Sequence, residues 1–129
     1  MKKINSIMLI DDDAVTNFYH KIIIQRVNCC ERIDVFDDPT EALEHLKDTQ
    51  ELPNIIFLDI NMPKMNGWEL IENILKNGLD EKLNACMIVM LTTSRNIKDE
   101  EKAFKYEIIS QFKHKPLTQE ILEEIIAVL

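Results

Sequence analysis

The sequence predicts an α/β protein in which helices cover both faces of a five-stranded parallel sheet. Five short apolar runs alternate with five longer amphipathic segments over 129 residues, a length that fits one domain. Three of the short runs are apolar throughout, which is typical of parallel strands buried on both faces. Hydrophobic residues make up 46% of the chain and charged residues 29%, a balance that allows both a buried core and a well-solvated surface.

The short apolar runs are the expected strands. The first, third and fourth runs are apolar and therefore central, whereas the second and fifth carry polar residues, as edge strands can. Right-handed crossovers then predict the strand order 2-1-3-4-5 of a doubly wound sheet. In chain order the expected strands are Ile4–Ile10, Arg32–Phe36, Asn54–Leu58, Cys86–Leu91 and Ile108–Phe112.

The longer segments have helical periodicity and helix start signals. Asp38 before Pro39, and Asn96 before Ile97, have the side chains of N-cap residues. The expected helices are Ala14–Val27, Pro39–Asp48, Gly67–Asn77, Asn96–Phe104 and Thr118–Leu129. Apolar stripes on three of them are predicted to face the core: Val15, Phe18, Tyr19, Ile22 and Ile23; Trp68, Ile71, Ile74 and Leu75; and Ile121, Leu122, Ile125, Ile126 and Leu129.

Polar residues with useful chemistry follow the expected strands at their carboxyl ends. In a doubly wound sheet, ligands bind at this edge, where the winding reverses. Each signal alone is weak, because an aspartate cluster is more often a solvated turn or a helix start. Their convergence at one edge of the sheet predicts a functional site that contains Asp11, Asp12, Asp59, Thr92 and Lys115.

This set of side chains suits a divalent cation and a phosphoryl group. Clustered carboxylates repel one another unless a cation lies between them, and Mg²⁺ or Mn²⁺ prefers oxygen ligands of this kind. The hydroxyl of Thr92 and the ammonium of Lys115 would complete a site for phosphoryl oxygens. A carboxylate such as Asp59 can attack phosphorus and form an acyl phosphate.

The sequence resembles the CheY-like receiver domains of two-component signalling. The resemblance covers the whole chain and rests on four motifs, of which the D-x-x-M-P-x-M-x-G segment from Asp59 to Gly67 is the most specific. It implies one receiver domain over residues 1–129 with no attached output domain. The four motifs are Ile7–Asp13, Phe57–Gly67, Leu91–Ser94 and Phe112–Leu117.

The resemblance also implies a role for each residue that matches a family motif. Two positions depart from the usual pattern, since Thr93 replaces a small residue and Lys105–Glu107 lacks a glycine. The peptide bond before Pro116 is cis in the family, and Asp13 is a helix cap or a bystander. The implied roles are Asp59 as phosphoacceptor, Asp12 as direct Mg²⁺ ligand, Asp11 as ligand through water, the backbone carbonyl of Asn61 as further ligand, Thr92 as switch hydroxyl, Lys115 as phosphoryl partner and Phe112 as switch aromatic.

A receiver of this kind is a phosphorelay switch and not a turnover enzyme. By resemblance, its phosphodonor is a sensor histidine kinase or a histidine phosphotransfer protein, and its output face is formed by the fourth helix, fifth strand and fifth helix. The downstream protein target is unknown. Three alternatives are a relay intermediate that passes the phosphoryl group to a second histidine, a degenerate receiver that only binds partners, and a haloacid dehalogenase-type phosphatase. The last needs a second aspartate where this chain has Asn61.

Composition narrows the partners and the compartment. A net charge of -8 disfavours binding to nucleic acid or to anionic membranes, because like charges repel. No segment approaches the roughly 20 apolar residues of a membrane span. Three cysteines without a C-x-x-C pair predict reduced thiols in a cytoplasmic protein. The histidines lack metal-ligand spacing and are expected to be exposed or hydrogen-bonded: His20, His45 and His114.

Overall fold

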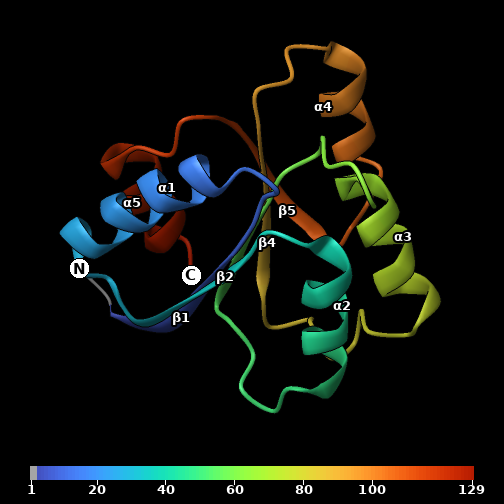
Figure 1. The fold of residues 1–129 in the computed structure, drawn as a ribbon, viewed down its shortest axis with the longest axis horizontal. Helices are drawn as coiled ribbons and strands as arrows, with labels where there is room; N and C mark the ends of the chain where they lie inside the picture. Colours follow the sequence, from blue (N-terminus) through green and yellow to red (C-terminus); the bar gives the residue numbers. More distant parts are fainter. Residues whose placement is uncertain (1–2) are drawn as a thin grey trace.

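The computed structural model describes residues 3–129 and contains the predicted sheet, with five parallel strands in the order β2-β1-β3-β4-β5. Helices α1 and α5 cover one face, and α2, α3 and α4 cover the other (Figure 1). The strands are β1 (Ile4–Ile10), β2 (Cys30–Phe36), β3 (Ile55–Leu58), β4 (Met87–Thr92) and β5 (Ile109–His114). The helices are α1 (Ala14–Val27), α2 (Pro39–Asp48), α3 (Gly67–Lys76), α4 (Ile97–Ala103) and α5 (Gln119–Ala127).

Side-chain alternation along the central strands builds a hydrophobic core on each face of the sheet. Successive strand residues point to opposite faces. Leu9 and Phe57 therefore pack with the α5 residue Ile125 in one core, whereas Met8 and Ile56 belong to the other core. Asp11 and Asp59 follow β1 and β3 directly, and the register pairs Ile10 with Leu58. The two aspartates are thereby placed side by side at the carboxyl edge.

All five helices begin at an N-cap residue whose side chain accepts a backbone N–H of the first turn, as helix N-termini require. At α3 the cap is a full capping box, in which Glu69 also accepts the backbone N–H of Asn66. The predicted bounds of β1, α1 and α2 are confirmed, and each of the other elements differs by one or two residues at one or both ends. The N-cap residues are Asp13, Asp38, Asn66, Asn96 and Thr118.

The apolar stripe predicted for α1 faces the core only in part: Ile23 packs against it and Ile22 is half-buried, but the N-terminal half of the stripe is exposed. Val15, Phe18 and Tyr19 are 76%, 67% and 46% exposed, and the buried residues of α1 are instead Asn17, His20 and Ile24. The prediction was wrong for the N-terminal half of α1 because Asn17, His20 and Ile24 follow the same helical period. The two polar residues have hydrogen-bond partners in loops that a local pattern does not reveal.

Leu75 of α3 is also exposed, at 36%, whereas its neighbours Ile71 and Ile74 are buried. The reason is geometric, because Leu75 lies about 100° around the helix from Ile74. The stripe of α5 is confirmed by its buried residues Leu122, Ile125 and Ile126. None of the helices in the described part of the chain has the length and apolar character needed to cross a bilayer.

Candidate functional site

Three carboxylates meet at the carboxyl edge of the sheet, as predicted. One oxygen each from Asp11, Asp12 and Asp59 lies within 4.8 Å of the other two. Asp11 and Asp59 are buried, at 4% and 6% exposure, while Asp12 is exposed at the rim. The backbone N–H of Asp59 donates to the carbonyl of Ile10 at 3.0 Å, which fixes the end of β3 against the end of β1.

The ammonium of Lys115 lies between the two buried carboxylates. Its Nζ is 2.5 Å from Asp11 Oδ2 and 3.2 Å from Asp59 Oδ1. Lys115 follows β5, precedes the cis bond to Pro116, and donates its backbone N–H to the carbonyl of Thr92 at 2.9 Å. One hydrogen bond therefore ties the predicted phosphoryl partner to the predicted switch residue.

Burial and charge perturb the titration of this cluster. Burial, followed by the charge of Asp11, raises the pKa of Asp59 from 3.8 to about 6, although Lys115 opposes the shift. Burial disfavours the charge on Lys115, but its hydrogen bonds and charge interactions with Asp11 and Asp59 outweigh this and raise its pKa. Lys115 is therefore a cation at neutral pH.

Two buried polar residues of α1 hold the loops that carry the site. The amide of Asn17 donates to the backbone carbonyl of Asp11 at 2.7 Å, and the Nε2 of His20 accepts the N–H of Leu117 at 3.3 Å. Burial, followed by the charge of Lys115, lowers the pKa of His20 to about 4, so this imidazole is neutral and can accept. Asn17 was not predicted, and His20 was predicted only to be exposed or hydrogen-bonded. With Ile24 the two residues form a second stripe of helical period that competes with the predicted apolar one.

Gly67 allows α3 to start close to the backbone of the third strand. A Cβ at this position would lie 2.5 Å from the carbonyl oxygen of Asp59 and 3.0 Å from Cα of Ile60. The N–H of Gly67 donates to the carbonyl of Ile60 at 2.7 Å. The glycine that ends the D-x-x-M-P-x-M-x-G segment is thus required by a close approach next to the central aspartate.

The remaining predicted residues surround this cluster at different depths. Thr92 is fully buried at the end of β4, and its hydroxyl accepts the N–H of Ser94 at 3.1 Å. Asn61 is exposed in the loop after β3. Phe112 is half-buried on β5, where its ring lies edge-on to that of His114 at 5.6 Å. Asp13 caps α1.

The donor set fits a hard divalent cation. It consists of carboxylate oxygens only, close enough together to share one ion, and one of its members is open to water. Mg²⁺ and Mn²⁺ favour such oxygen ligands, and Mg²⁺ usually keeps several waters when it binds through a few carboxylates. The carboxylates present therefore fit a site for a cation of this kind.

The model of the "response regulator receiver domain" family matches residues 7–127. The chain belongs to this family. Receiver domains act in two-component signalling, and the fold found here is the receiver fold. A solved two-component response regulator from Cytophaga hutchinsonii superposes with a TM-score of 0.89 and 33% identity, covering 98% of this chain and 97% of that one.

The chain matches most of the length of one curated relative and only a small part of another. It is 28% identical over 124 residues to the probable methanogenesis regulatory protein FilR2 of Methanothrix harundinacea, covering 93% of this chain and 77% of that protein. It is 32% identical over 87 residues to protein-glutamate methylesterase/protein-glutamine glutaminase 3 of Burkholderia thailandensis. That match covers 67% of this chain but only 22% of the relative.

Proposed function

We propose that this receiver accepts one phosphoryl group on Asp59, with the help of Mg²⁺ or Mn²⁺, and works as a switch and not as a turnover enzyme. The observation that carries the proposal is the position of the Asp59 carboxylate. It is buried, its Oδ1 lies 3.2 Å from the Nζ of Lys115, and it is grouped with Asp11 and Asp12. Asp11 is the one other described carboxylate that is buried, paired with Lys115 and placed at the end of a central strand. Asp59 is proposed in preference to Asp11 because it opens the D-x-x-M-P-x-M-x-G segment and so matches the phosphoacceptor position of the receiver family.

The reaction is a phosphoryl transfer to a carboxylate oxygen. An Asp59 oxygen attacks phosphorus, the bond from phosphorus to the donor atom breaks, and the leaving group keeps the electron pair. The product is an acyl phosphate. Asp59 must be ionised to attack, and its pKa of about 6 leaves it mostly ionised at neutral pH.

The bound cation would neutralise charge on the phosphoryl oxygens. Asp12 and Asp59 are the proposed direct ligands, Asp11 would bind through a water, and the backbone carbonyl of Asn61 would be a further ligand. Lys115 lies beside Asp59 already and would pair with the added negative charge. Thr92 would donate its hydroxyl hydrogen to a phosphoryl oxygen.

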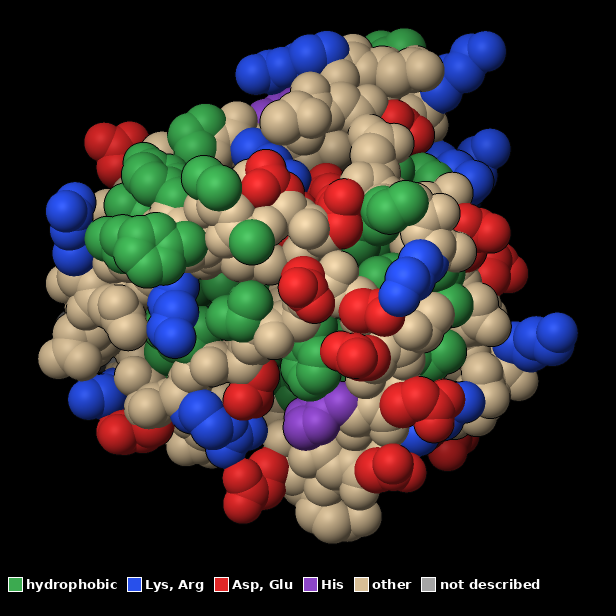
Figure 2. Space-filling view, in the orientation of Figure 1, with side chains coloured by type: hydrophobic (Ala, Val, Ile, Leu, Met, Phe, Trp, Pro, Cys, Tyr) green, Lys and Arg blue, Asp and Glu red, His purple; other side chains and the backbone are tan. Residues whose placement is uncertain are grey.

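The exposed face of α1 is the proposed docking surface for the phosphodonor. Asp59 is nearly inaccessible, so a protein donor must seat its phosphohistidine at the mouth of the site, next to the start of α1. Figure 2 shows hydrophobic side chains gathered on the surface over α1. They include Val15, Phe18 and Tyr19, and a 320 Å³ groove between Phe18 and Val35 extends this surface to the edge strand β2. A sensor histidine kinase or a histidine phosphotransfer protein is the expected partner.

The output is proposed to leave through α4, β5 and α5 to a downstream protein. Phe112 packs against the core that α2, α3 and α4 cover, and its partner across the sheet is Met90. Inward movement of Thr92 toward a phosphoryl group would open space beside β5 that Phe112 can fill. Phosphorylation would then shift the population between two positions of this ring.

Incubation with acetyl phosphate and Mg²⁺ tests the proposal against its rivals. A switch retains one phosphoryl group per chain, as seen by intact mass, and releases inorganic phosphate slowly. Rapid phosphate release without a retained group would indicate a phosphatase. Neither retention nor release would indicate a module that only binds partners. Removal of Mg²⁺ with a chelator is expected to abolish the mass shift.

Donor docking is tested by a comparison of two phosphodonors. Phe18→Ser is expected to slow transfer from a phosphorylated histidine protein, because it removes an anchor of the α1 face, and to leave transfer from acetyl phosphate unchanged. Phe104→Ser is the matched control, since Phe104 is 82% exposed but lies at the end of α4. Equal slowing with both donors would overturn the docking assignment.

A further inference from the structure

A hydrogen-bonded chain leads from Thr92, at the end of β4, to Trp68 on α3. The Thr92 hydroxyl accepts the N–H of Ser94 at 3.1 Å, and the Ser94 hydroxyl donates to Asp99 Oδ2 at 2.5 Å. The indole N–H of Trp68 donates to Asp99 Oδ1 at 3.3 Å. One carboxylate on the first turn of α4 therefore joins the loop after β4 to α3.

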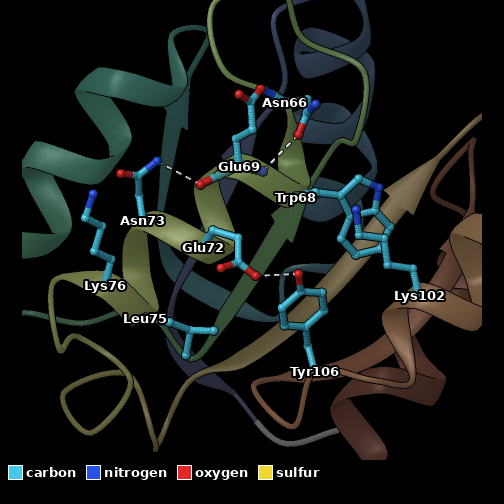
Figure 3. A pocket seen from close by; sticks show the side chains of 9 residues that line it. All are labelled: Asn66, Trp68, Glu69, Glu72, Asn73, Leu75, Lys76, Lys102 and Tyr106. Carbon is cyan, nitrogen blue, oxygen red and sulfur yellow. Dashed lines mark hydrogen bonds between the residues drawn. The ribbon is translucent and has the colours of Figure 1, made fainter.

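Trp68 forms one wall of a groove of about 720 Å³ between α3 and α4 (Figure 3). Its ring stacks on Tyr106 at a centroid distance of 6.0 Å and an angle of 19°, and the ammonium of Lys102 lies 5.0 Å from its ring centroid. Tyr106 in turn donates to Glu72 at 2.5 Å. Residues of α4 and of the loop that follows it thus set the environment of this indole.

We propose that Ser94, Asp99 and Trp68 are positioning residues that hold the Thr92 hydroxyl in its resting place, so that Trp68 reports the phosphoryl state of Asp59. This inference rests on the proposed function. A hydroxyl has one hydrogen, and Thr92 must turn it toward the phosphoryl group in order to donate. When the hydroxyl moves, the N–H of Ser94 either follows it or loses its acceptor.

An N–H that follows the hydroxyl displaces the Ser94 side chain, and one that loses its acceptor releases Ser94 from Thr92. The Ser94 side chain has two further contacts. Its hydroxyl donates to Asp99 and accepts the N–H of Asn96 at 3.3 Å, and Asn96 is the N-cap of α4. The start of α4 is therefore bound to the loop that moves. Lys102 belongs to the same helix, so a shift of α4 changes two contacts of Trp68 together, the hydrogen bond from its indole and the cation over its ring.

The coupling has a reciprocal consequence. If phosphorylation weakens the chain from Thr92 to Trp68, then weakening that chain by mutation favours the phosphorylated state by the same factor. Ser94→Ala removes the hydroxyl that links the loop to Asp99 and leaves every residue of the phosphoryl site in place. This variant is expected to bind beryllofluoride, a phosphoryl mimic, more tightly than wild type does.

The fluorescence of Trp68 is the readout of the test, because Trp68 is the single tryptophan of the chain. The full chain is incubated with acetyl phosphate and Mg²⁺, and fluorescence emission and intact mass are recorded on the same samples. Wild type and Ser94→Thr, which keeps the hydroxyl, are expected to change emission when the phosphoryl group appears. Ser94→Ala is expected to gain the phosphoryl group, but its emission should change no more than that of Asp59→Asn. Asp59→Asn is the control for effects of the cation and the donor that do not depend on phosphorylation.

Each contrary result has a distinct meaning. A phosphorylated wild type with unchanged emission would overturn the inference and leave the proposed function standing. A full emission change in phosphorylated Ser94→Ala would show that the signal does not pass through Ser94, which also overturns it. Absence of any mass shift in wild type would overturn the proposed function itself and this inference with it.

Discussion

Helices α1 and α3 both carry apolar residues at helical spacing but bury different kinds of side chain. Helix α3 buries its apolar residues Ile71 and Ile74 in the core. Helix α1 buries Asn17 and His20 and exposes Phe18 to solvent. Exposure of a large apolar side chain gives no hydrophobic stabilisation, and burial of a polar one costs free energy unless it is hydrogen-bonded.

The difference follows from what each helix contacts. Helix α3 lies over the apolar face of β3 and β4, whereas the N-terminal half of α1 lies beside the loops that carry Asp11 and Lys115. Asn17 and His20 are buried because those loops supply a carbonyl and an N–H for them to bind. Helix α3 therefore stabilises the fold, while α1 supports the site and leaves an apolar surface open to a partner.

The largest expected effect on stability is in α3. Ile71→Ala removes a fully buried side chain and is expected to lower the free energy of unfolding by about 2–5 kcal/mol, through lost burial and the cavity left behind. Chemical denaturation with urea measures the change. A loss below about 1 kcal/mol would mean that the α3 stripe is not tightly packed.

The second-largest expected effect is the loss of folding stability caused by burial of the Asp59 carboxylate in the site. A pKa of Asp59 raised from 3.8 to about 6 means that the folded state binds the proton more tightly than the unfolded state, so stability falls as pH rises through this window. Above it the loss amounts to about 3 kcal/mol, and Asp59→Asn is expected to recover up to this amount without metal.

The unfolding free energy of both proteins from pH 4 to pH 7 checks the sign. Subtraction of the two curves at each pH removes contributions that they share, including that of His20, whose lowered pKa has the opposite effect on stability. The advantage of the variant should grow with pH and then level off above the pKa of Asp59. An advantage that shrinks with rising pH would contradict the electrostatic account.

A smaller effect is expected for the polar side of α1. His20→Leu leaves the buried N–H of Leu117 without its acceptor and should cost about 1–3 kcal/mol, although leucine is the more apolar residue. His20→Gln, which can supply an acceptor oxygen, is the matched control and should recover part of the loss. If leucine stabilises the protein, His20 contributes nothing through this hydrogen bond.

The smallest effect is expected for the exposed side of the same helix. Phe18→Ser changes a side chain that is 67% exposed, so the free energy of unfolding should stay within about 0.5 kcal/mol of wild type. Thermal unfolding of the two proteins, scanned side by side, provides the measurement. A clear destabilisation would show that Phe18 packs against its own chain, and the contrast between α1 and α3 would disappear.

The sequence was sufficient to predict the topology, because three wholly apolar runs identify central strands and crossovers are right-handed. It also predicted that Asp11, Asp59 and Lys115 converge, since parallel strands bring their carboxyl ends to one edge. The inward face of α1 could not be predicted in this way. Two stripes with the same period compete there, and the choice depends on partners such as Leu117, which is 97 residues away from His20. A local pattern does not contain such long-range contacts.

The most direct test of the central claim is the intact mass of wild type and Asp59→Asn after incubation with acetyl phosphate and Mg²⁺. The account predicts one added phosphoryl group on wild type, located at Asp59 by peptide mapping, and none on the variant. Phosphorylation of Asp59→Asn at the wild-type level, or peptide mapping to Asp11 or Asp12, would contradict the assignment of Asp59 as the phosphoacceptor.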